Sequence, residues 1–137
     1  MRTTLSVAVV GIGLLLAAGP VVAHHAFSAE FDASNPVLLR GTVTKTEWIN
    51  PHSWIHIAVK GADGTVETWA IECGAPNSLI RQGLNKNSIP VGTELVIDGF
   101  RAKDRSAMAN AKDIMFHDGR KFFVGSSGTG APYEKRQ

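Results

Sequence analysis

An apolar run near the start of the chain limits how much of it is left to fold. The run extends from Leu5 to Ala18, is interrupted only by small residues, and follows a single basic residue, Arg2. The segment Pro20-Val21-Val22-Ala23 then supplies a helix breaker and small side chains at the −3 and −1 positions of a secretory cleavage site. We therefore expect residues 1–23 to be a signal peptide and the periplasmic or secreted mature chain to begin at His24.

Cleavage after Ala23 leaves 114 of the 137 residues, which is enough for one domain with a modest core. An uncleaved anchor is the alternative, since Leu5 to Ala23 is 19 residues long, near the lower limit for crossing a bilayer. Glycines within the run and the lack of a basic stop-transfer flank favour cleavage. After cleavage we expect no membrane association.

The charge balance of the mature chain argues against nucleic acid as a partner. Because Arg2 leaves with the signal peptide, 13 of the 14 Lys and Arg remain against 12 Asp and Glu, a net charge of about +1. Nucleic-acid-binding proteins usually carry a basic stripe, which this chain lacks. Cys73 is the single cysteine, so no intramolecular disulfide can form, and we expect it to be a small buried side chain.

The middle of the chain carries the patterns of β-strands. Residues 53–60 alternate, with Ile55 and Ile57 on one face and Trp54 and His56 on the other. Asp-Gly pairs at 63–64 and 118–119 predict hairpin turns. Further strands are expected at residues 37–49, 65–72, 93–101, 110–116 and 120–124.

A short helix is expected between the third and fourth strands. Residues 76–82 begin with a proline and are followed by Gly83, the usual order of a helix start and stop. The first strand contains Gly41 and loses its alternation, which indicates a bend or bulge. These features predict a mainly β fold, a small Greek-key β-barrel of the oligomer-binding (OB) type, with an open β-sandwich as the alternative. The expected organisation is a lead-in at 24–36, a barrel domain at 37–124 and a Gly/Ser-rich tail at 125–137.

An N-terminal histidine offers metal chemistry that an internal histidine lacks. The α-amine and imidazole of a mature His24 can chelate one ion, and a second imidazole would complete a T-shaped, nitrogen-rich site of the kind that favours Cu(II). Copper is therefore the one cofactor that the sequence suggests. The candidates for the second imidazole are the remaining histidines, His25, His52, His56 and His117.

Among these histidines, His52 is favoured because it lies beside the Asn50-Pro51 turn, where a ligand can be aimed. His52 and His56 would be about 13 Å apart along an extended strand, too far for one ion to bind both. Glu30 and Asp32 could supply an oxygen ligand or accept a hydrogen bond from an imidazole. The alternative for His52 is a hydrogen bond to the turn backbone.

The same stretch offers an aromatic surface for an organic ligand. The residues concerned are Trp48, Asn50, His52 and Trp54, and small barrels often bind ligands on a sheet face. Packing of Trp48, Trp54 and Trp69 in the core and across strands is the alternative. The sequence has no nucleophile elbow, His-Glu-x-x-His helix, paired-cysteine motif or dinucleotide fingerprint, so we do not expect an enzyme.

Four motifs of the mature chain resemble those of a family of small exported bacterial proteins classed as domain of unknown function 6152. They are HHAFSAEFD at 24–32, EWINPHSW at 47–54, GAPN at 74–77 and VGSSGTGAPY at 124–133. The resemblance implies export and a compact β fold, and it brings no established activity.

Two functional hypotheses follow from the sequence. The first is a non-catalytic exported binding module of OB type, whose ligand would be a small molecule, a saccharide or a partner protein. The second is a periplasmic copper-binding protein that uses His24 together with His25 or His52. Only the second requires the free α-amine of His24.

Overall fold

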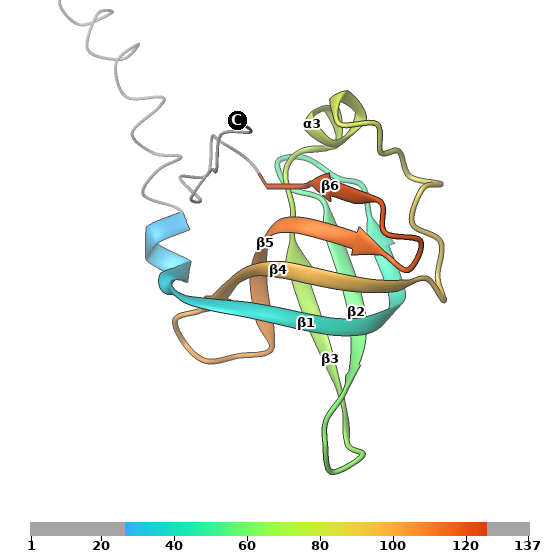
Figure 1. Cartoon of the computed structure of the whole chain (residues 1–137). Helices are drawn as coiled ribbons and strands as arrows, with labels where there is room; N and C mark the ends of the chain where they lie inside the picture. The colour runs from blue at the N-terminus through green and yellow to red at the C-terminus, as the bar shows by residue number, and fades with distance from the viewer. Residues whose placement is uncertain (1–26, 126–137) are drawn as a thin grey trace, which may run out of the picture.

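A computed structural model describes residues 27–125 as a mainly β fold (Figure 1). A single helical turn at 27–30 precedes the first strand. The signal-peptide cleavage, His24, His25 and the tail from residue 126 lie outside the described residues. The elements are β1 Phe31–Glu47, β2 Trp54–Lys60, β3 Val66–Glu72, α3 Pro76–Arg81, β4 Glu94–Ala102, β5 Met108–Phe116 and β6 Lys121–Phe123. In this part of the chain, no helix has the length and apolar character needed to span a membrane.

The strands pair into a ring. The antiparallel order is β3-β2-β1-β4-β5-β6, and β3 also pairs with β5 in parallel, from Ala70 opposite Met108 to Glu72 opposite Asn110. Strands β1 to β5 therefore close on themselves, with α3 in the connection between β3 and β4 (Figure 1). This is the strand order and helix position that the OB-type prediction requires.

The first strand begins earlier than the sequence indicated, at Phe31 rather than residue 37. It is long because its first part pairs with β4 and its second part with β2. The predicted bend is confirmed: the register with β2 shifts between Val43 and Lys45. Gly41 is required just before the shift, because a Cβ there would lie 2.8 Å from the carbonyl oxygen of Ala58.

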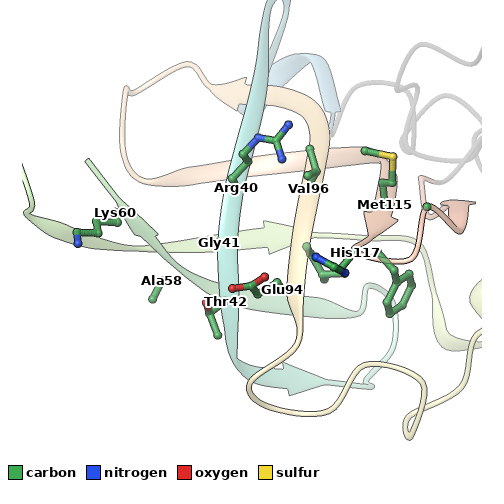
Figure 2. Close-up of a pocket in the computed structure, with 12 residues that line it drawn as sticks. Arg40, Gly41, Thr42, Ala58, Lys60, Glu94, Val96, Met115 and His117 are labelled. Carbon is green, nitrogen blue, oxygen red and sulfur yellow. The ribbon is translucent and has the colours of Figure 1, made fainter. Parts of the chain in front are cut away.

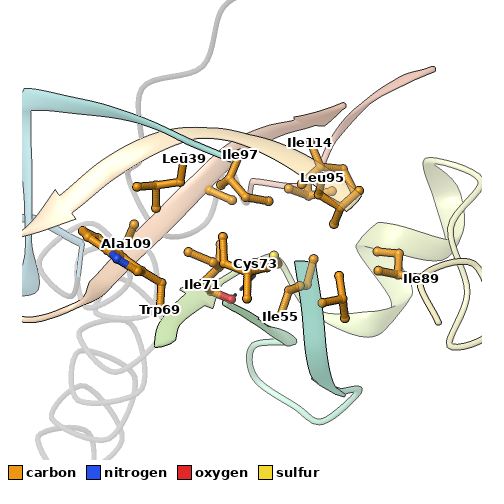
Figure 3. Close-up of a cluster of buried hydrophobic side chains, with 14 of the residues drawn as sticks. Leu39, Ile55, Trp69, Ile71, Cys73, Ile89, Leu95, Ile97, Ala109 and Ile114 are labelled. Atoms are coloured by element: carbon orange, nitrogen blue, oxygen red, sulfur yellow. Dashed lines mark hydrogen bonds between the residues drawn. The ribbon is translucent and has the colours of Figure 1, made fainter. Parts of the chain in front are cut away.

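The inside of the ring holds the main hydrophobic core (Figure 3). Ile55 and Ile57 of β2 are buried, as their alternation predicted, and face Ile97 of β4 and Trp69 and Ile71 of β3 within one cluster. A second, smaller cluster lies apart from it. That cluster consists of Phe27, Phe31 and Ala102, with Phe100 and Met108 packed against them.

Cys73 fills space in the main core. Its side chain is 1% exposed, and its Sγ lies 3.9 Å from the carbonyl oxygen of Ile71. Burial raises the pKa of the Cys73 thiol, so the reactive thiolate is not available at neutral pH. The expectation of a small, buried side chain is confirmed.

Candidate functional site

A half-buried histidine, His52, lies two residues before β2. Ser53, Ile55 and Ile57 are buried, whereas His52 and Trp54 are only partly covered. The predicted alternation along this segment is thus confirmed, and it places His52 and Trp54 on the outer face of the ring.

The buried carboxylate of Glu72 meets His52 on this face, and the buried amide of Asn110 holds that carboxylate. Trp54 of β2 is the register partner of Glu72 of β3, and Glu72 is the partner of Asn110 of β5. Directly paired residues point to the same face of a sheet, so the three side chains share the outer face. The Nδ2 of Asn110 donates a hydrogen bond of 3.0 Å to Oε1 of Glu72, and Nδ1 of His52 lies 3.6 Å from the same oxygen.

Glu72 is an unusual residue for the outside of a small barrel, because it is only 5% exposed. Burial raises the pKa of Glu72, while the charge of His52 and the hydrogen bond from Asn110 oppose that shift. The charge of Glu30 raises the same pKa further. A carboxyl group that is buried, and held by one amide and one imidazole, is a candidate for a functional role.

The amide that holds this carboxyl group has a polar atom without a partner. Within residues 27–125, Oδ1 of Asn110 is buried and has no hydrogen-bond partner, and Asn110 is 2% exposed. Since buried polar atoms are nearly always paired in folded proteins, this oxygen marks a place beside Glu72 where a ligand atom or a water would improve the site. Oγ of Ser53 is also buried without a partner, but Ser53 alternates with His52 and Trp54 and so faces the other side.

The start of the described chain is fixed near the same face. The ring of Phe27 stacks on Phe31 with centroids 5.6 Å apart and meets Phe100 edge-on at 5.8 Å. The backbone N–H of Lys103 donates to the carbonyl oxygen of Glu30, and Nζ of Lys103 hydrogen-bonds the carbonyl oxygen of Ser28. Residues 27–31 are therefore held by side-chain packing and by main-chain hydrogen bonds.

The other predicted site residues are placed differently. Trp48 is partly buried against the main core, and Asn50 is exposed and precedes Pro51 through a cis peptide bond. Trp69 lies in the core, with Arg101 5.1 Å over its ring. Of the three tryptophans, Trp54 is therefore the one that shares the outer face with Glu72.

The remaining predicted ligands have partners or lie elsewhere. Nε2 of His56 is 2.7 Å from Oε2 of Glu47, so a second His–Glu pair exists on the β1–β2 ribbon. A hydrogen bond from Lys45, and then the contact with His56, lower the pKa of Glu47. Asp32 accepts hydrogen bonds from the backbone N–H and Oγ of Ser34, where the register of β1 with β4 shifts between Phe31 and Pro36.

A separate groove of about 450 Å³ lies across β1, β2, β4 and the end of β5 (Figure 2). Apolar atoms of Val96 and Met115 line it together with the charged side chains of Arg40, Lys60 and Glu94. The sequence gives no hint of this groove, because its lining comes from four short segments that only the strand pairing brings together.

Glu72 and Asn110 were also missed by reasoning from the sequence. The alternation of β3 put Trp69 and Ile71 inside and so put Glu72 outside, which predicts an ordinary solvated carboxylate. Its burial depends on the parallel pairing of β3 with β5. No periodic signal in the sequence reports that pairing.

No metal centre is complete within residues 27–125, since no three His, Cys, Asp or Glu side chains there converge on one point. His52 and Glu72 together supply only two candidate metal ligands.

The fold and the site together define a small β-ring protein with a polar, half-buried face and no recognised catalytic motif. The chain belongs to the family of unknown function DUF6152, whose model matches residues 12–111 and so includes His52, Glu72 and Asn110. No curated protein and no solved structure matches the chain.

Proposed function

We propose that this protein is an exported, non-catalytic binding module and that its ligand is a copper(II) ion held on the face that carries His52. The ligands would be the α-amine and imidazole of the processed His24, with His52 as the second imidazole. His25 is the alternative second imidazole from the same segment. Three nitrogen ligands of this kind suit Cu(II) better than harder divalent ions.

The observation that carries the proposal is the meeting of two parts of the chain at Glu72. His52 lies 3.6 Å from its carboxylate, and the charge of Glu30, from the segment that leads back to His24, also acts on it. The packing of Phe27 against Phe100 fixes that segment only two strands away from Glu72. Neighbouring strands are about 4.8 Å apart, so the distance across them is about 10 Å.

The length of chain that precedes Phe27 limits how far His24 can lie from the described residues. His24 is three residues from Phe27, and three residues span at most about 10 Å. The proposal therefore requires residues 24–26 to run extended toward the His52 ring. A chain that keeps its first 23 residues has no amine at that position.

Replacing His52 tests the second ligand. We expect His52→Ala to weaken Cu(II) binding to the mature chain by more than about 100-fold, because partners that only orient a ligand are already worth ~10–100-fold. Isothermal titration of Cu(II) in a weakly competing buffer measures the change.

His117→Ala is the matched control for the His52 variant. His117 is exposed and directly follows the end of β5, and the six steps from Asn110 to Phe116 along that strand span about 20 Å at about 3.4 Å per residue. Equal affinities of the His52 and His117 variants would remove His52 from the site. His25→Ala then asks whether the neighbouring imidazole is used instead.

An organic ligand is a second candidate, and the groove beside Val96 favours it. Its volume of about 450 Å³ lies within the usual range for small-molecule sites, and Arg40 and Lys60 would suit an anionic group. We expect the amphipathic anion anilinonaphthalene sulfonate to bind the folded protein and Arg40→Ala to weaken it about tenfold, since a charge-assisted hydrogen bond is worth ~1.5–3 kcal/mol. Fluorescence titration measures this, with exposed Arg81→Ala as control. Equal affinity of the two variants would argue against the groove.

A further inference from the structure

The buried carboxylate of Glu72 is held in one orientation from both sides. Asn110 donates to Oε1 at 3.0 Å, and Nδ1 of His52 faces the same atom at 3.6 Å. Asn110 thereby leaves its own Oδ1 without a partner among the described residues, although it is 2% exposed. The orientation of the amide therefore satisfies the carboxylate of Glu72 and leaves the oxygen of Asn110 without a hydrogen bond.

The imidazole of His52 is divided between a buried and an accessible side. Its side chain is 27% exposed, whereas that of Glu72, which faces Nδ1, is 7% exposed. A carboxylate accepts hydrogen bonds and cannot donate them, so it favours the tautomer that carries the proton on Nδ1. In that tautomer Nε2 has the free lone pair, which is the form of imidazole that binds a metal.

We propose that Glu72, fixed by Asn110, is the positioning residue that prepares His52 to bind a metal ion through Nε2. The inference rests on the proposed copper site, because it assigns the reason why His52 rather than another histidine is the internal ligand. Metal-bound histidines usually donate their other ring N–H to a carboxylate or carbonyl, and that partner sets the tautomer and the ring orientation. In this protein, Glu72 is the carboxylate positioned to accept the ring N–H of His52.

The position of Glu72 supports a role beyond stabilising the fold. A buried ionised group is expensive to desolvate, and replacing such a group by a well-packed apolar residue is often neutral or stabilising. Glu72 lies on the outer face of the ring, so the main core does not depend on it for packing. A purely structural role would therefore be filled better by an apolar side chain.

The first experiment compares Glu72→Gln with Glu47→Gln in the mature chain that begins at His24. Both variants remove the carboxylate of a His–Glu pair: Glu72 of β3 faces His52 at 3.6 Å, and Glu47 of β1 pairs with His56 of β2 at 2.7 Å. We expect Glu72→Gln to weaken Cu(II) binding about 10–100-fold and Glu47→Gln to leave it unchanged. Equal Cu(II) affinity in the two variants would overturn the positioning role. Thermal unfolding confirms that each variant is folded, and Asn110→Ala replaces Glu72→Gln if the latter does not fold.

The second experiment needs no metal. Long-range nitrogen–proton correlation spectra of the metal-free protein report which ring nitrogen of His52 carries the proton. We expect the Nδ1–H tautomer in the native sequence and its loss in Glu72→Gln. A native His52 with the proton on Nε2 would contradict the inference.

The two experiments separate the failure of this inference from the failure of the copper proposal. If the native chain binds Cu(II) through His24 and His52 but Glu72→Gln changes neither affinity nor tautomer, the copper site stands and the positioning role is wrong. If the native chain does not bind Cu(II), the copper site is wrong, and the positioning role for a metal falls with it whatever the tautomer.

Discussion

Blocking the α-amine of His24 is expected to lower the Cu(II) affinity of the mature protein by more than about 100-fold. The amine and the imidazole of one residue form a chelate, and an added residue converts the amine into an amide that has no free lone pair at neutral pH. In the described part of the chain, the remaining internal imidazole belongs to no cluster of three His, Cys, Asp or Glu side chains. Loss of a direct ligand should exceed the ~10–100-fold effect of losing a group that only orients one.

The extension that blocks the α-amine must not create a new copper site of its own. One or two added residues would place a histidine third in the chain, where an amine, amides and an imidazole form a new copper chelate. A Gly-Ser-Gly-Ser extension before His24 avoids this arrangement. Tight binding that survives this extension would exclude the α-amine as a ligand. His24→Ala, which keeps an amine but removes the ring, measures the contribution of the imidazole separately.

Removing the ring of Phe31 is expected to give the largest loss of stability among the changes considered. Phe31 is 2% exposed and joins Phe27 to Ala102 in the second hydrophobic cluster. Truncation of a buried Phe to Ala costs about 3–5 kcal/mol, through lost transfer energy and the cavity left behind. Urea unfolding followed by tryptophan fluorescence measures the free energy of unfolding.

The same substitution should weaken copper binding, because the cluster holds the segment that carries His24. If the segment is attached for only a tenth of the time, the apparent dissociation constant rises about tenfold. Leu38→Ala is the control on the same strand, since Leu38 is 67% exposed and its loss should cost less than about 0.5 kcal/mol. Equal Cu(II) affinities of the folded Phe31→Ala and Leu38→Ala variants would show that the cluster does not anchor the segment.

Local patterns in the sequence predicted most of the fold. The alternation of residues 53–60 identified the buried face of β2, and Gly64 and Gly119 have the positive φ values of 84° and 86° that their turns need. The helix at Pro76–Arg81 and the bend near Gly41 were also predicted correctly. These features depend on residues that are close together in the chain, so a local pattern can report them.

The candidate site was only half predictable, because it depends on contacts between distant segments. His52 and Trp54 were found from the turn and the alternation. Glu72 and Asn110 are 38 residues apart, and they meet through the parallel pairing of β3 with β5. The early start of β1 was missed for a similar reason: Phe31 belongs to a cluster completed by residues of β4 and β5.

The most direct test is a Cu(II) titration with electron paramagnetic resonance on exported protein whose mass shows that it begins at His24. The copper proposal predicts one tight equivalent of Cu(II), with hyperfine splitting from nitrogen ligands that changes in the extended chain and, through the loss of one nitrogen, in His52→Ala. Weak binding, several equivalents, or a spectrum that is unchanged in the extended chain would contradict it.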